Sequence, residues 1–328
     1  MKALVMISGE GPRGLSMKDV AAPSCGPDEL RVGVKASALN RADLLQTLGL
    51  YPAPAGVPSD IPGLEYAGEV LEVGARVTRW KKGDRVMGLV AGGAWAEQLV
   101  THEREAIAMP EGLEFSRAAA IPEAFITSFD ALALQGQLTA GTQVLIHAVA
   151  SGVGTAALQL CALFGARPIG TGRNAAKLER ATHLGLRDTV LVNAEQPHFA
   201  DRVKALTSGR GVDLVLDLVG GDWLPQTLDA MAPQGTLMLV GLVAGASAEV
   251  PLRTVLGKRL TVIGTTLRAR PLEEKIAVAR SFEQLLVPHF KTTRLAPVID
   301  RVVPIVEAPA ALERLAANDS FGKTVLTW

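Results

Sequence analysis

VLIHAVASGVGTAALQLCALFGA, residues 144–166, contains the pattern that decides the fold. An apolar, strand-forming run at 144–150 ends in a Ser-Gly-Val-Gly turn, and an amphipathic helical run follows it. A strand, a tight glycine turn and a helix form the unit that places a pyrophosphate on a helix N-terminus. Only Gly154 matches G-x-G-x-x-G, because Val149 and Ser151 occupy the positions of the first two glycines. The turn alone therefore leaves two interpretations open, plain packing of a strand on a helix or a dinucleotide site.

Similar apolar runs alternate with helical patterns from about residue 142 to residue 264. They are PIGTG (168–172), TVLV (189–192), VDLVLDLVG (212–220), GTLMLVG (235–241) and LTVIG (260–264). Such an alternation predicts an α/β fold with a doubly wound parallel sheet of the Rossmann type.

The two ends of the chain differ from this middle part. The first 120 or so residues hold short strand-like runs separated by glycine and proline, which is typical of a compact, mostly β domain. A long helical segment (272–290), an extended run (297–305), a short helix (308–317) and a closing strand (323–328) end the chain, and we expect them to return to the first domain. The predicted boundaries are 1–122 for the N-terminal part of the catalytic domain, 123–267 for the Rossmann domain and 268–328 for the return.

The end of the second strand of this middle part indicates which dinucleotide is bound. An NAD site places an acidic residue there to hold the ribose hydroxyls. This chain has no acid at that point and instead has Arg173 and then Lys177. Two cations favour the 2′-phosphate of NADPH, although Lys177 alone also fits an ordinary solvated helix position.

Composition excludes several classes of partner. The chain has 328 residues with 48% hydrophobic content, enough for two domains, and its 33 basic residues balance 33 acidic ones. A balanced charge argues against nucleic acid or an anionic membrane as partner. The first residues lack a signal-peptide pattern and no apolar run has the length of a membrane span, so we expect a cytoplasmic protein.

Seven segments, in order along nearly the whole chain, carry a family resemblance. They are ALNRADLLQTLGLYP (38–52), IPGLEYAGEV (61–70), GDRVMGL (83–89), AAAIPEAFITSF (118–129), VLIHAVASGVGTAALQL (144–160), VDLVLDLVGG (212–221) and FGKTVL (321–326). The chain resembles the zinc-independent quinone oxidoreductases of the medium-chain dehydrogenase/reductase superfamily, the zeta-crystallin-like group, and within it the p53-inducible type. The resemblance implies a GroES-like, mostly β catalytic domain around a central Rossmann domain, with the active site between them.

The same comparison argues against zinc. The zinc enzymes of this superfamily have a Cys where this chain has Asn40 and a His-Glu pair where it has Leu64 and Glu65. Catalytic zinc needs about three protein ligands, the superfamily's structural zinc takes four cysteines, and the chain has two cysteines in all. His147, beside the glycine turn, fits a core or supporting histidine better than a ligand. Without a Lewis acid, reduction of a quinone or a conjugated carbonyl is favoured over alcohol oxidation.

The resemblance also implies where the substrate lies. Asn40 and Tyr51 match positions that line the substrate side, and the Tyr51 hydroxyl would donate a hydrogen bond to the quinone oxygen as charge develops there. The alternative is that Tyr51 packs beside Pro52. Asp43 and Gln46 either orient Asn40 or are polar helix residues, and both interpretations stay open.

Further positions are assigned to the cofactor by resemblance. Thr127 and the loop 241–245 would lie near the nicotinamide, and Ser151 would either bind the cofactor or narrow the turn. Many relatives have a Tyr near the adenosine phosphate where this chain has Ala194, so one phosphate contact is missing. The complete predicted set comprises Thr127, Ser151, Gly152, Val153, Gly154, Arg173, Lys177, Gly241, Leu242, Leu267 and Lys323.

Several functions remain compatible with these residues. The favoured one is an NADPH:quinone oxidoreductase; the alternatives are an NADPH-dependent enone or alkenal reductase and a non-catalytic NADPH-binding protein of the crystallin kind. The run GKRLTVIG (257–264) reads as the last strand of the Rossmann sheet, with an edge free to pair with a second copy. We therefore expect a homodimer. The natural substrate and the choice between one- and two-electron reduction do not follow from the sequence.

Overall fold

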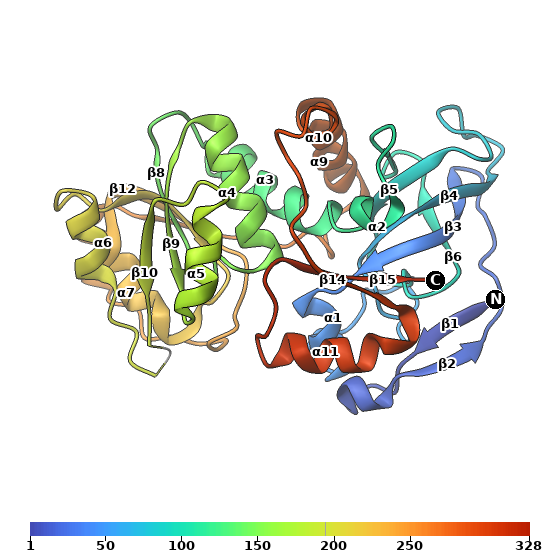
Figure 1. Cartoon of the computed structure of the whole chain (residues 1–328), viewed down its shortest axis with the longest axis horizontal. Coiled ribbons are helices and arrows are strands. Elements are labelled where there is room, and N and C mark those ends of the chain that lie inside the picture. Colours follow the sequence, from blue (N-terminus) through green and yellow to red (C-terminus); the bar gives the residue numbers. More distant parts are fainter. Residues whose placement is uncertain (194) are drawn as a thin grey trace. The chain divides into compact units, whose positions relative to one another are not determined.

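The computed structural model describes residues 1–193 and 195–328 of the chain. It divides into two compact units, which we describe separately (Figure 1). Unit 1 comprises Met1–Ile126 together with Leu267–Trp328, and unit 2 comprises Thr127–Thr266. The domain boundaries at residues 122 and 267 remain predictions from the sequence.

Unit 2 is built on a six-stranded sheet in which every neighbouring pair of strands is parallel. Its strands are β8 (Gln143–Ile146), β9 (Arg167–Gly172), β10 (Asp188–Leu191), β11 (Val212–Asp217), β12 (Met231–Leu239) and β13 (Thr261–Gly264). They lie in the order β10-β9-β8-β11-β12-β13, so the chain reverses direction across the sheet between β8 and β11. This is the strand order of a Rossmann sheet, and the predicted fold class is confirmed.

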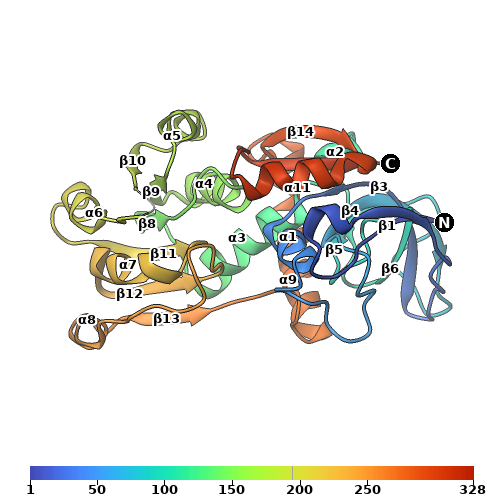
Figure 2. The ribbon, with the colours of Figure 1, turned by 90° about the horizontal axis from the view of Figure 1, so that it is seen from below.

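Helices cover both faces of this sheet. Figure 2 shows α6 and α7 on one side of the strands and α4 on the other. The helices are α3 (Thr127–Phe129), α4 (Gly152–Phe164), α5 (Ala175–Thr182), α6 (Ala200–Leu206), α7 (Leu224–Ala230) and α8 (Leu252–Lys258), with a π-helical segment at Asp130–Gln135 and a short 3₁₀ turn at Gly221–Trp223. Buried Leu145, Val215 and Leu237 of the strands pack with Phe199 and Trp223 into one apolar core.

The predicted strand 257–264 is wrong in its first half. Gly257 and Lys258 belong to α8, and Arg259, with a left-handed backbone at φ 55°, ends that helix before β13 begins at Thr261. Tertiary contacts explain the difference, because the Lys258 ammonium donates to the carbonyl oxygens of Asp229 at 2.7 Å and Met231 at 2.8 Å. These carbonyls lie at the end of α7, where intrahelical partners are missing.

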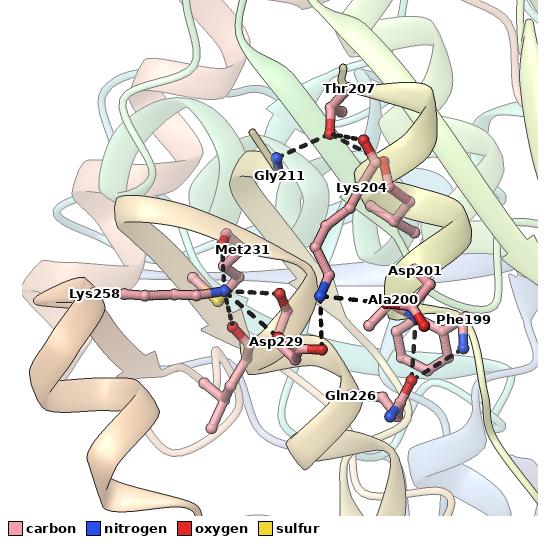
Figure 3. Close-up of polar contacts among 12 residues, drawn as sticks. Phe199, Ala200, Asp201, Lys204, Thr207, Gly211, Gln226, Asp229, Met231 and Lys258 are labelled. Atoms are coloured by element: carbon pink, nitrogen blue, oxygen red, sulfur yellow. Dashed lines mark hydrogen bonds and ion pairs between the residues drawn. The ribbon is translucent and has the colours of Figure 1, made fainter. Parts of the chain in front are cut away.

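The same cluster of side chains joins three helices (Figure 3). The Asp229 carboxylate of α7 accepts from the Lys204 ammonium of α6 at 2.9 Å, and Lys258 of α8 lies 3.9 Å from the other oxygen of the same carboxylate. No residue of α8 is fully buried and only partly buried Val255 packs against the apolar core, so Lys258 adds a polar contact to this packing. The cluster thereby fixes the helix that precedes the edge strand β13.

Unit 1 contains a seven-stranded, mostly antiparallel sheet and a two-stranded one. The strands are β1 (Lys2–Val5), β2 (Ser16–Asp19), β3 (Glu29–Ala38), β4 (Glu65–Val73), β5 (Arg85–Leu89), β6 (Gln98–His102), β7 (Ile107–Ala108), β14 (Ile299–Pro304) and β15 (Lys323–Thr327). The large sheet has the order β14-β15-β3-β4-β5-β7, with β6 also paired to β3. The C-terminal strand β15 therefore lies next to β3.

Helices complete unit 1. They are α1 (Arg41–Thr47), α2 (Phe115–Ala118), α9 (Leu272–Leu285), α10 (Val287–Lys291) and α11 (Ala308–Ala316), with 3₁₀ turns at Gly11–Gly14 and Ile305–Glu307 and a π-helical segment at Pro122–Ile126. The predicted continuous helix over 272–290 is instead divided at Leu286. Pro288 explains the break, because proline lacks the N–H of an interior helix residue and its ring clashes with the preceding turn.

Two further features bear on environment. Neither stretch of the described chain, 1–193 or 195–328, contains a helix long and apolar enough to span a membrane. Both cysteines, Cys25 and Cys161, are free thiols.

Candidate active site

Asn40 lies between the end of β3 and the start of α1. Its backbone N–H donates to the Asp43 carboxylate at 2.8 Å, and the other oxygen of Asp43 accepts from the backbone N–H of Gly63 at 3.1 Å. Asp43 is fully buried, and this burial raises its pKa to about 7 against the lowering effect of these hydrogen bonds and of Lys323. Of the two open roles for Asp43, the geometry matches orientation of Asn40.

The side-chain amide of Asn40 is held at both ends. Its Oδ1 accepts from the Lys323 ammonium at 2.6 Å, while its Nδ2 donates to Glu65 Oε1 at 3.0 Å and to the Ala38 carbonyl at 3.3 Å. Lysine can only donate and a carboxylate accepts, so the orientation of the amide is fixed by chemistry. Both amide hydrogens are used, and the Asn40 side chain also accepts from the backbone N–H of Asp43 in a capping box.

Lys323 and Glu65 form a buried ion pair beneath Asn40. The ammonium and the carboxylate oxygen are 2.6 Å apart, and the side chains are 5% and 0% exposed. Lys323 also donates to the Leu39 carbonyl at 2.7 Å, and Glu65 Oε2 accepts from the backbone N–H of Glu123 at 2.8 Å. The three hydrogens of the ammonium are thus matched by three acceptors within unit 1. A contact of Lys323 with a cofactor remains a prediction and would require one of these bonds to be released.

Tyr51, in the loop after α1, is half-buried and lies against Arg268. The Arg268 guanidinium carbon is 5.0 Å from the centroid of the Tyr51 ring, and the same guanidinium donates to the Tyr51 carbonyl at 3.1 Å. Gln46 accepts a short hydrogen bond from Arg268 and donates to the Ser59 carbonyl at 3.2 Å. Gln46 therefore supports the Tyr51 loop through Arg268 and makes no hydrogen bond to Asn40 in the described structure.

The glycine turn of unit 2 begins α4 with a side-chain cap. Ser151 Oγ accepts from the backbone N–H of Gly154 at 3.0 Å. A Cβ on Gly154 would lie 2.6 Å from the Ala148 carbonyl oxygen, so only glycine fits this close approach. Gly152 and Val153 are the first two residues of α4, where backbone N–H groups lack intrahelical partners. This cap matches the role in which Ser151 shapes the turn. The hydrogen of the Ser151 hydroxyl is still able to donate to a ligand.

Thr127 carries an orphaned hydroxyl near this turn. Its Oγ1 is buried and has no hydrogen-bond partner within the described part of the chain. The next residue, Ser128, donates from its hydroxyl to the Val153 carbonyl at 2.9 Å, which ties the segment to the glycine turn. A buried, unsatisfied hydroxyl is costly unless a ligand supplies the missing bond. The glycine turn and this hydroxyl together fit a dinucleotide in unit 2.

Arg173 and Lys177 lie at the carboxyl end of β9, as the sequence predicts. Arg173 is exposed directly after the strand, and Lys177 is partly exposed in the first turn of α5, which Asn174 caps. Both cations lie at the carboxyl edge of the sheet, which is where folds of this type bind their ligands. Ala194, the position of the missing tyrosine, lies outside the described residues.

The loop that follows β12 approaches the loop that follows β11. The backbone N–H of Gly241 donates to the Asp217 carbonyl at 3.1 Å, and a Cβ on Gly241 would lie 2.5 Å from the Leu218 carbonyl oxygen. Leu242 is 52% exposed next to this contact. The loop thus extends the same carboxyl edge of unit 2, whereas Leu267 is the first residue of the returning segment of unit 1.

His147 is fully buried beside the glycine turn and is held by two hydroxyls. Thr227 Oγ1 donates to the Trp223 carbonyl at 3.0 Å, so it accepts from His147 Nε2 at 2.9 Å. The hydrogen is therefore on Nε2, and Nδ1 accepts from the Thr171 hydroxyl at 2.8 Å. Burial lowers the pKa of His147, against an opposing effect of Asp217, which favours a neutral ring within the core.

The structure thus assembles two groups of predicted residues. Asn40, Asp43 and Lys323 share one network in unit 1, with Gln46 and Tyr51 joined by Arg268, while the glycine turn and the cations belong to unit 2. Arg268 was missed, since a single arginine after the last Rossmann strand carries no pattern. Across residues 1–193 and 195–328, no three His, Cys, Asp or Glu side chains gather closely enough to hold a metal ion.

Two family models match parts of the chain. Residues 26–111 match the family model described as alcohol dehydrogenase GroES-like domain, and residues 152–283 match that described as zinc-binding dehydrogenase. The chain is 35% identical to a quinone oxidoreductase of Pseudomonas aeruginosa over 96% of each protein.

Two solved structures extend the comparison. The quinone oxidoreductase of Pseudomonas syringae superposes with a TM-score of 0.89 at 31% identity, covering 100% of this chain and 99% of the other. The CurK enoyl reductase superposes with a TM-score of 0.87 at 26% identity over 99% and 98% of the two chains.

Proposed function

Because the chain belongs to the quinone oxidoreductase family of the medium-chain dehydrogenase/reductase superfamily, we propose that it reduces a quinone with NADPH and without zinc. A nicotinamide-dependent oxidoreductase is the activity that the family carries. The choice of quinone, of NADPH and of zinc-free chemistry is our proposal, argued from the residues below.

The buried Lys323–Glu65 ion pair is the observation that supports a reaction without zinc. Glu65, which accepts from the Asn40 side-chain amide, is already bound to an ammonium at 2.6 Å, and within residues 1–193 and 195–328 no three His, Cys, Asp or Glu side chains form a metal-binding group. A dication at this point would face the positive charge of Lys323 at close range. The pair therefore favours a site that orients its substrate by hydrogen bonds.

The proposed reaction balances as one hydride plus one proton. The hydride would come from bound NADPH, giving NADP⁺, and the quinone would take up that hydride and a proton from solvent to give the hydroquinone. The Tyr51 hydroxyl would donate to the substrate oxygen that becomes negative. Asn40, whose amide is held by Lys323 and Glu65, would line the substrate side of the site.

In unit 2, backbone N–H groups and side chains would bind the cofactor. The N-terminus of α4 at Gly152–Phe164 offers unpaired N–H groups to a pyrophosphate. The orphaned hydroxyl of Thr127 would hydrogen-bond the nicotinamide part, and Arg173 and Lys177 would bind the 2′-phosphate. Gly241 and Leu242 would border the nicotinamide, with Leu267 nearby in the chain that leaves unit 2.

An enone reductase is the second candidate, and the likeness to an enoyl reductase structure favours keeping it. Conjugated carbonyls and quinones both accept hydride at carbon while an oxygen becomes negative, so the same Tyr51 donor serves either. A non-catalytic NADPH-binding protein is the third candidate, because fold alone does not separate binding from turnover.

A substrate panel separates the three candidates. NADPH consumption should be fast with 1,4-benzoquinone and 9,10-phenanthrenequinone and slow with an alkenal, and dialysis against a chelator should leave the rate unchanged. The physical reason is that hydrogen bonds, without a metal, are expected to stabilise the developing oxyanion. Turnover of the alkenal alone would support the enone reductase, and tight NADPH binding without turnover the binding protein. Loss of quinone turnover in the chelated sample, with recovery on adding zinc, would contradict the zinc-free proposal.

We also propose a cytoplasmic location, which the two free thiols fit, since reducing compartments keep cysteines unpaired. Small molecules, rather than nucleic acid, are the proposed partners.

The proposed homodimer is supported by one edge of unit 2. β13 has a strand neighbour on one side only, and Val262 on it is 48% exposed. Leu252 and Leu256 of the preceding helix are 73% and 79% exposed. An uncovered edge strand with apolar neighbours is a liability unless a partner pairs with it, and a two-fold contact would extend the sheet.

Light scattering tests this assembly. The wild-type protein should have the mass of two chains at micromolar concentration, and Val262→Glu combined with Leu256→Glu should convert it to monomer because the charges would be buried in the contact. Leu191→Glu is the matched control, since Leu191 is 58% exposed on β10, the opposite edge of the same sheet. A wild-type monomer, or a dimer that survives the double substitution, would refute this interface.

A further inference from the structure

Arg268 is a buried cation of unit 1 to which the proposed reaction gives no role. Its side chain is 9% exposed and donates to three segments: to the Ala91 carbonyl at 2.7 Å, to the Tyr51 carbonyl at 3.1 Å and to Gln46 Oε1. These acceptors lie after β5, after α1 and within α1 respectively. The guanidinium therefore has one defined position.

No carboxylate of the described residues forms an ion pair with this charge, although those of Asp43 and Glu123 act on it from farther away. Within residues 1–193 and 195–328, Arg268 makes no ion pair, whereas most other buried or half-buried cations of unit 1, such as Lys323 and Arg280, do. Taking an unpaired charge out of water is costly, so the fold retains it against a penalty. What the charge faces instead is an aromatic ring, the phenol of Tyr51, with 5.0 Å between the guanidinium carbon and the ring centroid.

We propose that Arg268 is a positioning residue for Tyr51, which fixes the phenol against its guanidinium and stabilises the negative charge that builds on the phenol oxygen when Tyr51 donates its hydrogen bond. The proposal rests on the role given to Tyr51 above. Arg268 is not among the site residues predicted from the sequence. Its proposed role is electrostatic and goes beyond packing against the ring.

Groups around the Tyr51 phenol shift its pKa in opposite directions. Burial is the largest influence and raises the pKa of Tyr51, the Arg268 guanidinium lowers that pKa, and the Glu123 carboxylate raises it. Arg268 thus opposes both burial and Glu123. A cation over a ring also attracts its π electrons, which orients the phenol while leaving the hydroxyl at the rim free. Removal of the cation should make the phenol a weaker acid and a weaker donor.

The composition allows a direct measurement on the protein without cofactor. The chain has two tyrosines, Tyr51 and Tyr66, so labelling with [¹³Cζ]tyrosine gives two NMR signals. Tyr66 is fully buried and burial raises its pKa far above the ordinary value, so its signal should stay constant on titration and report that unit 1 is folded. Tyr51→Phe assigns the remaining signal.

In Arg268→Met the Tyr51 signal should titrate at higher pH than in wild type, and Arg268→Lys should lie between them because the cation remains without the planar stacking. Arg85→Met is the matched control: Arg85 lies 4.4 Å from the Phe115 ring centroid and donates to the Leu113 carbonyl at 2.7 Å, the same arrangement over a ring without a hydroxyl. It should leave the Tyr51 titration unchanged. An unshifted Tyr51 titration in Arg268→Met, with the Tyr66 signal intact, would overturn the proposal.

A kinetic cycle tests the same link in the working enzyme. Arg268→Met should lower kcat with quinones about three- to ten-fold, and the loss should vanish in a Tyr51→Phe background because the group it acts through is gone. An equal loss in both backgrounds would contradict action through Tyr51. If Tyr51→Phe itself keeps full activity, the role proposed for Tyr51 fails, while the NMR titration still decides whether Arg268 acts on the phenol.

Discussion

Replacement of Lys323 by methionine should lower the free energy of unfolding by about 3–5 kcal/mol, because it leaves the buried Glu65 carboxylate without its ammonium partner. The Leu39 carbonyl and Asn40 Oδ1 would lose a donor at the same time. Urea denaturation followed by circular dichroism would measure the loss as a lower midpoint. We expect this to be the largest stability change of any single substitution discussed above.

Two further variants separate charge pairing from packing. Glu65→Gln together with Lys323→Met should be little worse than Lys323→Met alone, since no unpaired charge remains in the double variant. Lys81→Met removes a comparable pair, Lys81–Asp84 at 2.7 Å, whose lysine side chain is 84% exposed, and should leave the midpoint nearly unchanged. If the losses of Glu65→Gln and Lys323→Met simply add, the ion pair is not the source of the stability.

The Lys323–Glu65 pair shows which features of the molecule can be predicted from the sequence. The six strands of unit 2 and the turn at Gly154 follow from local patterns, since apolar runs and a glycine turn are read within about 20 residues. Lys323 was also singled out, but for a cofactor, because a resemblance transfers a position and not its hydrogen bonds. Its partner Glu65 lies in a strand far away in the sequence, and only the pairing of β15 and β4 with β3 brings the two together.

Arg268 is a residue that local sequence patterns cannot identify. It joins Gln46 across 222 positions of sequence and has no periodicity, spacing or motif that marks it. The errors at 257–264 and 272–290 have a different origin. The first arises because the contacts of Lys258 with the end of α7 override strand propensity, and the second because the helical pattern continues past the break that Pro288 causes.

The second large effect concerns the cofactor. Lys177→Ala should weaken NADPH binding about ten-fold or more, and with Arg173→Ala about hundred-fold or more, because each charge-assisted bond to a phosphate contributes ~1.5–3 kcal/mol and 1.4 kcal/mol corresponds to ten-fold in affinity. NADH lacks the 2′-phosphate, so its affinity should stay nearly constant. Fluorescence titration of each variant with both cofactors measures the two dissociation constants side by side.

Arg187→Ala is the matched control for this measurement. Arg187 is an exposed arginine of the same unit, but it stands directly before β10 and so at the amino edge of the parallel sheet, opposite the carboxyl end of β9 where Arg173 follows. Its removal changes the net charge as much as Lys177→Ala does, yet it should leave NADPH affinity nearly unchanged, since charges farther apart than about 10 Å are screened at 0.1 M salt. Equal losses for NADPH and NADH in Lys177→Ala would mean that Lys177 supports the fold of the site and does not recognise the phosphate. Equal losses in Arg187→Ala and Lys177→Ala would mean that overall charge, rather than a bound phosphate, sets the affinity.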